Sequence, residues 1–288
     1  MTDHLLAADT AMGPVTLSVG DLDAMTAYYR DAVALRVMDA AGDTLTLGRG
    51  TTPVIILKHT PALKHASGRD AGLFHTAILF ETEEALAASV YSVAQKYPAA
   101  FTGSSDHLVS KAFYFSDPEG NGVELYWDRE RSAWSWVHGS IEMSTLYLDP
   151  NTFLRENLTE RAATEPMIGG AAVGHVHLKV GDVATAREFY VGRVGFDETV
   201  AFGDQALFVS AGGYHHHMAM NTWNSRGAGP RLPALGLAHV DIEVPAVDDL
   251  TALADRMTHF GIQTRNDGQT VSFNDPWANV IRVGVASA

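Results

Sequence analysis

The sequence predicts an α+β fold made of four copies of one strand–helix–three-strand unit (βαβββ), because three stretches recur along the chain. The recurring stretches are LSVGDL at 17–22 and LKVGDV at 178–183, FHTAIL at 74–79 and AHVDIE at 238–243, and DPEGN at 117–121 and DPWAN at 275–279. A tyrosine also stands eight residues after the aspartate of the first pair, at Tyr29 and Tyr190. These matches place the starts of the four units near residues 13, 73, 174 and 238.

The elements of each unit follow from its hydrophobic pattern. In the first unit we expect a helix at 21–33 and strands at 14–19, 35–40, 44–48 and 53–58. In the third unit we expect a helix at 182–194 and strands at 174–180, 196–202, 205–211 and 215–223. Asp21 and Asp182 precede the two helices and are expected to cap them, because an aspartate side chain accepts hydrogen bonds from the free amides of a first helical turn.

Two units per domain is the natural division of a chain of 288 residues. We expect a first domain at residues 1–139 and a second at 171–288. The segment 140–170, which contains Asp149-Pro150-Asn151 and Gly169-Gly170, is expected to connect them.

The composition narrows the class of protein. A net charge of −14 argues against nucleic acid or an anionic membrane as the main partner. The absence of cysteine excludes disulfides and thiolate metal sites and leaves histidine and carboxylate as the strong metal ligands. The start of the sequence lacks the pattern of a signal peptide and no apolar run has membrane-spanning length, so we expect a soluble, cytoplasmic protein. Exposed sheet edges in such an architecture favour a homo-oligomer.

Residues 107–124, HLVSKAFYFSDPEGNGVE, concentrate the candidate chemistry. Phe113 and Phe115 alternate with Tyr114 and predict a strand, DPEGN predicts a tight turn, and a second strand returns through Glu124. A carboxylate on an otherwise apolar strand is costly to bury unless its charge is compensated. A metal ion is one candidate for that compensation.

The fourfold pattern resembles the vicinal oxygen chelate superfamily, which includes glyoxalase I, fosfomycin and bleomycin resistance proteins, and extradiol dioxygenases. The resemblance covers nearly the whole chain and implies that two units pair into a U-shaped mixed sheet that cups a divalent metal. Ligands then come from the first and last strands of a unit. The first-strand positions hold Pro14, His75, His175 and His239, and the last-strand position holds Glu124 in the second unit and Arg282 in the fourth. Proline and a charged arginine cannot ligate a metal, so the first and fourth units have each lost a ligand.

Residues 105–124 also resemble the extradiol dioxygenase signature, through His107, Tyr114, the DPEG turn and Glu124. Ser105 departs from the residue types that the signature prefers at its first position. The segment 210–219 resembles the family segment that carries a pocket histidine, and aligning its apolar strand selects His216. A type I extradiol dioxygenase similar to catechol 2,3-dioxygenase is the family member implied.

The family's ligands are complete here only if the second unit pairs with the third, because these units hold His75, Glu124 and His175. We therefore predict that the second and third units pair around the metal and that the first and fourth pair without one. A distance above about 10 Å between His175 and Glu124 would contradict this pairing, since shared ligands lie ~2 Å from their metal.

The resemblance implies a 2-His-1-carboxylate Fe(II) site, with Mn(II) as an alternative metal, that binds a catechol and O2. His75, His175 and Glu124 would be the ligands, and the product would be a 2-hydroxymuconic semialdehyde or a relative of it. His216 would face the O2-binding side and move a proton, Tyr114 would hydrogen-bond the substrate oxygen, and His107 would orient the substrate.

Other interpretations stay open at the level of sequence. A glyoxalase-like isomerase or transferase, or a metal-free protein that binds an aromatic ligand, would have the same fold. His239 is interpreted as a structural relic of a lost site. The triplet at 215–217 suits a surface metal-binding patch as well as a pocket, and strand alternation would let either His216 or its two neighbours face the cup. Trp223 suits either a pocket mouth or a cap on the domain.

Overall fold

The computed structural model describes residues 5–137 and 140–286. Residues 1–4, on which part of the signal-peptide expectation rests, lie outside the described residues, as do the predicted domain end at 139 and the last two residues. No helix among the described residues is long and apolar enough to cross a membrane.

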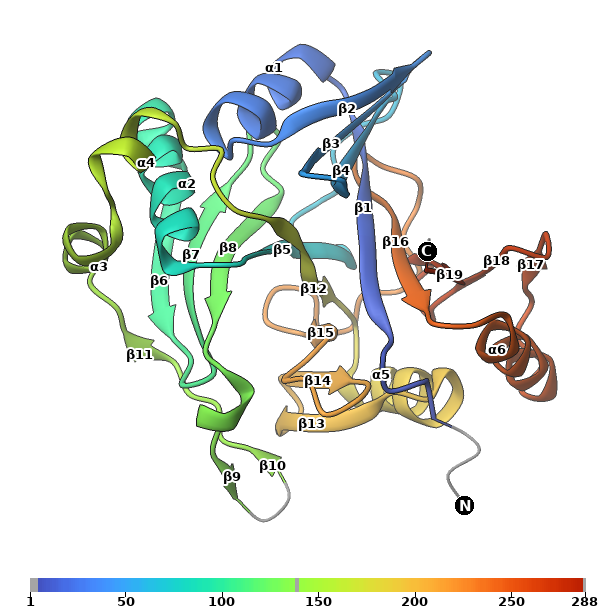
Figure 1. Ribbon diagram of the computed structural model, residues 1–288. Helices are drawn as coiled ribbons and strands as arrows, with labels where there is room; N and C mark the ends of the chain where they lie inside the picture. Colours follow the sequence, from blue (N-terminus) through green and yellow to red (C-terminus); the bar gives the residue numbers. More distant parts are fainter. Residues whose placement is uncertain (1–4, 138–139, 287–288) are drawn as a thin grey trace. The chain divides into compact units, whose positions relative to one another are not determined.

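The described residues form two curled mixed sheets with few helices, which confirms the predicted α+β class (Figure 1). In the eight-stranded sheet the order is β17-β18-β19-β16-β1-β4-β3-β2. Its strands are β1 (Ala11–Val19), β2 (Arg36–Ala41), β3 (Thr44–Arg49), β4 (Thr52–His59), β16 (Gly236–Val244), β17 (Arg265–Asn266), β18 (Thr270–Asn274) and β19 (Val280–Val285).

The nine-stranded sheet has the order β11-β6-β7-β8-β5-β12-β15-β14-β13. Its strands are β5 (Gly72–Phe80), β6 (Phe101–Asp106), β7 (Ser110–Ser116), β8 (Gly122–Asp128), β11 (Leu146–Tyr147), β12 (Ala171–Lys179), β13 (Asp197–Phe202), β14 (Ala206–Ser210) and β15 (Met218–Asn221). A separate short hairpin consists of β9 (Trp136–Val137) and β10 (Ser140–Ile141).

The strand order confirms the predicted pairing of the repeats. The nine-stranded sheet joins the strands of the second unit, β5 to β8, with those of the third, β12 to β15. The eight-stranded sheet joins the strands of the first and fourth units. The first and second units therefore lie in different sheets, and so do the third and fourth.

By proximity of Cα atoms the chain divides into two compact units, each assembled from separate segments. One comprises residues 1–16, 64–74 and 175–288, and the other comprises residues 17–63 and 75–174. The divisions fall inside β1, β5 and β12, so these three strands contribute residues to both. The predicted domain limits stay a prediction.

The helices begin where the sequence predicts and end differently. Asp21 accepts a 2.9 Å hydrogen bond from the Ala24 amide, and Asp182 accepts a 2.7 Å bond from the Thr185 amide, so both act as N-caps. Each helix then widens into a π-helical turn, at Tyr28–Ala32 and Tyr190–Val194. The helices are α1 (Leu22–Ala27), α2 (Glu83–Lys96), α3 (Pro150–Asn157), α4 (Glu160–Thr164), α5 (Val183–Phe189) and α6 (Val247–His259).

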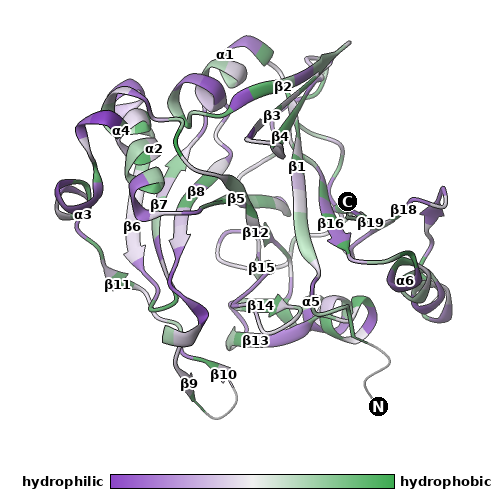
Figure 2. Cartoon of the chain, viewed as in Figure 1, coloured by the Kyte–Doolittle hydropathy of each residue, from purple (hydrophilic) through white to green (hydrophobic). Residues whose placement is uncertain are grey.

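Helix α2 packs against β8, the strand that carries Glu124 (Figure 1). It begins at the N-cap Thr82 and buries Leu86, Val90 and Val93. Figure 2 shows α2 mostly in pale green and white, whereas α3 is largely purple. This difference follows from the alanines of α2 and the polar sequence PNTFLREN of α3.

Two expectations about local structure need correction. The strand predicted at 215–223 begins only at Met218, so the histidine triplet lies in the loop before β15. Gly212 and Gly213, both with positive φ, turn the chain ahead of the triplet, and all three histidines are buried. The argument from strand alternation was therefore wrong, and so was the surface-patch interpretation. The segment 140–170 is also more structured than a simple connection, since it holds β10, β11, α3 and α4.

Candidate metal centre

His75 and Glu124 are brought together by two parallel strands. Strand β5 pairs with β8 so that His75 lies opposite Gly122 and Ala77 lies opposite Glu124. Side chains two residues apart on a strand share a face, which puts the imidazole and the carboxylate on the same side of the sheet. His75 Nε2 lies 2.9 Å from Glu124 Oε2, and both side chains are buried.

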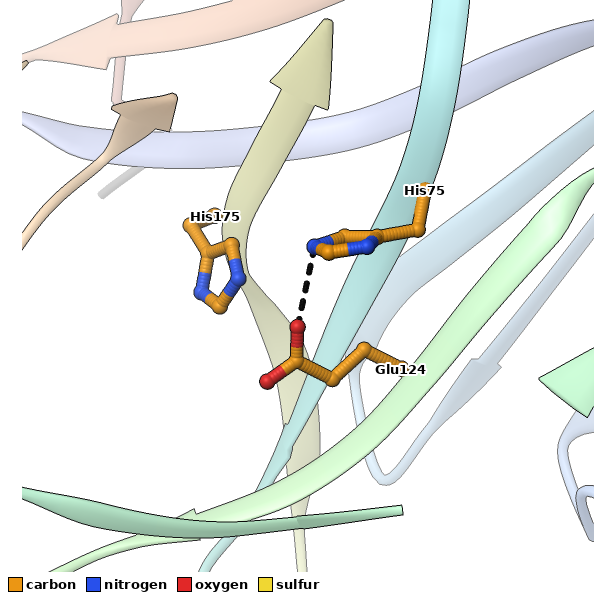
Figure 3. A group of neighbouring side chains, drawn as sticks. All are labelled: His75, Glu124 and His175. Carbon is orange, nitrogen blue, oxygen red and sulfur yellow. Dashed lines mark ion pairs between the residues drawn. The ribbon is translucent and has the colours of Figure 1, made fainter. Parts of the chain in front are cut away.

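His175 of β12 completes a cluster of three side chains. One potential ligand atom from each of His75, Glu124 and His175 lies within 4.8 Å of the other two. Figure 3 shows the two imidazoles and the carboxylate pointing toward one another, with the His75–Glu124 ion pair marked. The three residues are 6, 3 and 2% exposed. The sequence predicted this set, and the described residues bring all three together.

The donor set fits a divalent metal ion. Donor atoms that stand about 2.1 Å from one ion and at right angles to each other are about 3 Å apart. The 2.9 Å between His75 Nε2 and Glu124 Oε2 matches that separation. Two imidazoles and one carboxylate are also the ligand types that iron, manganese and zinc accept. The cluster could therefore hold a metal ion.

Tyr114 and His107 stand beside the carboxylate. Strand β7 pairs with β8 so that Tyr114 lies directly opposite Glu124. The Tyr114 hydroxyl is 2.7 Å from His107 Nε2, and the Tyr114 and His75 ring centroids are 5.7 Å apart. The structure therefore places both predicted residues at the cluster, Tyr114 beside it and His107 one hydrogen bond further out.

The tautomer of His107 follows from its second partner. His107 Nδ1 lies 2.8 Å from the carbonyl oxygen of Ser144, which can only accept. Nδ1 therefore carries a hydrogen, and Nε2 of the neutral ring is an acceptor. The single hydroxyl hydrogen of Tyr114 has two acceptors within reach, His107 Nε2 and the Glu124 carboxylate. Burial, and next the negative charge of Glu124, raise the pKa of Tyr114 well above its ordinary value. Tyr114 accordingly keeps its proton at neutral pH.

The predicted pocket histidine lies against a ligand position. The ring of His216 is 4.1 Å from the ring of His175, between centroids, and the Phe208 ring stands edge-on to His216 at 5.0 Å. His216 Nδ1 is 2.8 Å from His215 Nδ1, so one of the two rings donates to the other. The Thr199 hydroxyl donates to the His215 carbonyl at 2.7 Å and fixes the backbone there.

Sequence reasoning missed an aromatic group next to these histidines. His177 contacts Phe74, Phe208 and Trp223, with ring centroids 5.0, 5.8 and 5.5 Å away. His177 stands two residues after His175 and so shares its face of β12, a signal that the alternation of the strand already contained. Alternation along the strand could not single out Phe208, because all five residues of β14 are buried.

The other first-strand and last-strand positions lie in the eight-stranded sheet. Pro14 is in β1, His239 is in β16 and Arg282 is in β19. His239 Nε2 is hydrogen-bonded to Arg282 at 2.9 Å. None of them belongs to the three-residue cluster of His75, Glu124 and His175.

The curled sheets built from βαβββ repeats, with a histidine–carboxylate cluster on one of them, agree with the fold and the site that the resemblance in the sequence implies. The model of the Glyoxalase/Bleomycin resistance protein/Dioxygenase superfamily matches residues 172–283. A protein of Bacillus subtilis (strain 168) named catechol-2,3-dioxygenase is 33% identical over 273 residues, which are 93% of this chain and 94% of that protein. The chain belongs to this superfamily.

Solved structures agree on the fold at lower identity. A candidate dioxygenase from Bacillus subtilis subsp. subtilis str. 168 superposes with a TM-score of 0.65 and 14% identity, over 96% of this chain and 86% of that one. The cppA protein of Streptococcus pneumoniae TIGR4 has a TM-score of 0.61 and 10% identity, over 98% of this chain and 100% of that one. Glyoxalase I from Zea mays has a TM-score of 0.56 and 15% identity, over 96 and 92% of the two chains.

Proposed function

We propose that this protein is an extradiol dioxygenase, which uses O2 to open a catechol ring next to its diol and yields a product of the 2-hydroxymuconic semialdehyde type. The observation that carries the proposal is the cluster of His75, Glu124 and His175, within 4.8 Å of one another. It is supported by the 33% identity to a protein named catechol-2,3-dioxygenase. The limits of the two domains and a homo-oligomeric state remain predictions beside it.

In this proposal the three residues ligate Fe(II), or Mn(II), which favours the same ligands. Two neutral imidazoles, one carboxylate and a divalent ion together carry a net charge of +1. This positive charge attracts a catechol monoanion. Bound there, the metal supplies electron transfer and adjacent open positions for a diol and for O2. The protein supplies orientation, since both reactants are then held side by side.

Tyr114 and His107 are assigned to the substrate proton. A catechol hydroxyl that approaches the cluster beside Tyr114 Oη gives its proton to that oxygen, while the Tyr114 hydrogen passes along the 2.7 Å bond to His107 Nε2. The Ser144 carbonyl, 2.8 Å from His107 Nδ1, keeps the imidazole in the acceptor orientation and favours the cation that results. Tyr114 therefore stays neutral throughout the transfer.

His216 is assigned to the O2 side of the cluster. Its ring rests on His175 and is held by the neighbouring ring of His215. An imidazole hydrogen bond favours negative charge that develops on oxygen, and the same nitrogen can return a proton. Phe208, edge-on to His216, gives this side an apolar wall that suits an aromatic ring.

The test is anaerobic reconstitution of the chelator-treated protein with Fe(II), followed by a screen of substituted catechols with an oxygen electrode. We expect uptake of one O2 per catechol and a yellow product. Metal binding without oxygen uptake, together with isomerisation of a glyoxalase-type substrate, would replace the proposal with the glyoxalase-like function. Tight binding of a catechol by protein that takes up no metal would replace it with the ligand-binding function.

A further inference from the structure

The eight-stranded sheet contains a counterpart of the His75–Glu124 pair in which the carboxylate is replaced by a guanidinium. In β16 and β19, Asp241 lies opposite Arg282, as Ala77 lies opposite Glu124 in β5 and β8. His239 precedes Asp241 by two residues, as His75 precedes Ala77. His239 and Arg282 therefore occupy the places that His75 and Glu124 occupy in the other sheet.

The contact between these two residues determines which ring nitrogen of His239 carries the hydrogen. Arg282 Nη1 lies 2.9 Å from His239 Nε2. A guanidinium has only N–H donors, so the hydrogen bond requires the lone pair of Nε2, and the hydrogen of the neutral ring stands on Nδ1. That lone pair is the one a metal ion at this position would need.

Two further groups surround the same nitrogen. Asp241 Oδ1 is 3.4 Å from Arg282 Nε, and Asp241 Oδ2 is 3.3 Å from His239 Nε2. The Thr16 hydroxyl of β1 is 3.0 Å from His239 Nε2. The guanidinium thus presents positive charge to an imidazole nitrogen and a carboxylate at once, which is what a divalent cation does.

We infer that Arg282 is a built-in substitute for a metal ion in the eight-stranded sheet and that its guanidinium keeps a second, latent metal position closed. His239 and Asp241 are the ligands that this position retains, and residue 282 stands where the third would be. Once a carboxylate replaces the guanidinium, the ions it would accept are the divalent ones that combine histidine with carboxylate, such as Zn²⁺ and Co²⁺.

The surrounding charges argue against an anion-binding role for Arg282, although its side chain is 41% exposed. Its charge is shared with Asp241, and Glu243 stands two residues further along β16 on the same face. Two carboxylates beside one guanidinium give a negative local charge, which repels a carboxylate or phosphate ligand. A closed cation position therefore explains the group better than an open anion site.

The experiment counts metal equivalents. The full chain, freed of metal with a chelator, is titrated with Zn²⁺ and with Co²⁺, whose visible spectrum reports its ligands. We expect Arg282→Glu to bind one equivalent more than the wild type, because residue 282 then offers a carboxylate beside His239 and Asp241. The double variant Arg282→Glu/His239→Ala is expected to lose this extra equivalent. Arg282→Gln, the matched neutral control, is expected to add none.

A folded Arg282→Glu variant with the same count as the wild type would overturn the inference. The difference in count does not depend on whether the other cluster cleaves catechols. If that cluster took up no metal, both counts would fall by one and the difference would remain.

A second measurement determines the tautomer of His239 in the wild type and does not depend on Arg282→Glu. Nitrogen-15 NMR of histidine-labelled protein reports which ring nitrogen carries the hydrogen, and the His239 signal is assigned by its loss in His239→Gln. The inference requires the Nδ1–H form of His239 with Nε2 as acceptor. An Nε2–H form would contradict it, whatever the variants show.

Discussion

The hydroxyl of Tyr29 donates a 3.1 Å hydrogen bond to the buried carboxylate of Asp117, which belongs to the next repeat along the chain. The same relationship recurs between Tyr190 and Asp275 at 3.0 Å. Each tyrosine lies at the start of a π-helical turn, Tyr29 as its second residue and Tyr190 as its first, and each aspartate opens a DPxxN turn. Consecutive repeats that belong to different sheets are thus joined by one buried hydrogen bond, twice in the chain.

The Asp117 carboxyl makes stability depend on pH. Burial raises its pKa to about 6 from 3.8, although hydrogen bonds from Asn121 and Tyr29 act the other way. Because the folded pKa is the higher one, the favourable contribution of this group is complete below pH 3.8 and is lost as the pH rises through 6. We expect Asp117→Asn, which cannot ionise, to gain stability relative to the wild type between pH 4 and pH 7, by roughly 3 kcal/mol.

The measurement is urea unfolding of the two proteins across that range. Asp149→Asn is the control, because a hydrogen bond from Thr152 lowers the pKa of this carboxyl below 3.8, so its relative stability is expected to stay almost constant between pH 4 and pH 7. A stability difference between Asp117→Asn and the wild type that stays constant with pH would contradict the assignment.

We expect the buried Arg49 side chain to contribute strongly to the stability of the fold. It is 1% exposed and donates to four backbone carbonyls. These belong to Val33, Ala34, Pro166 and Ile168. Arg49→Met leaves these acceptors buried and should cost roughly 3 kcal/mol or more of unfolding free energy. Arg161→Met, at a side chain 80% exposed, is the control and should change stability by less than about 0.5 kcal/mol. The unfolding free energies are measured by thermal and by urea unfolding. If Arg49→Met and Arg161→Met lower them equally, Arg49 does not have this role.

The sequence predicted those features that depend on local pattern or on comparison between repeats. The N-caps Asp21 and Asp182 follow from local hydrogen-bonding chemistry. The pairing of the second and third repeats follows from Pro14 and Arg282, which cannot ligate a metal. The position of Glu124 follows from its signature segment.

Other features depend on contacts that no local pattern contains. The carbonyl partners of Arg49 are up to 119 residues away in the sequence. The loop conformation of the histidine triplet depends on the Thr199 hydroxyl, whose single hydrogen lies within reach of the carbonyls of His215, at 2.7 Å, and Phe208, at 3.1 Å. Two glycines with positive φ and this distant hydroxyl outweigh the β-forming preference of the segment.

His216 is expected to act in catalysis without holding the metal. We predict that His216→Phe keeps the metal content of the wild type and lowers kcat for catechol cleavage by about 10²–10⁴-fold, the usual loss when a general acid–base is removed. His259→Phe, at an exposed position at the end of α6, is the control and should leave kcat unchanged. Wild-type turnover by a fully metal-loaded His216→Phe would remove this residue from the mechanism.

Glu124→Ala removes the only carboxylate of the three-residue cluster. The variant and the wild type are loaded anaerobically with Fe(II), passed through a desalting column, and compared in iron content and in oxygen uptake with catechol. We predict close to one iron per chain and catechol-dependent oxygen uptake for the wild type, and loss of both for Glu124→Ala. Iron content near one per chain in Glu124→Ala, with oxygen uptake preserved, would contradict it.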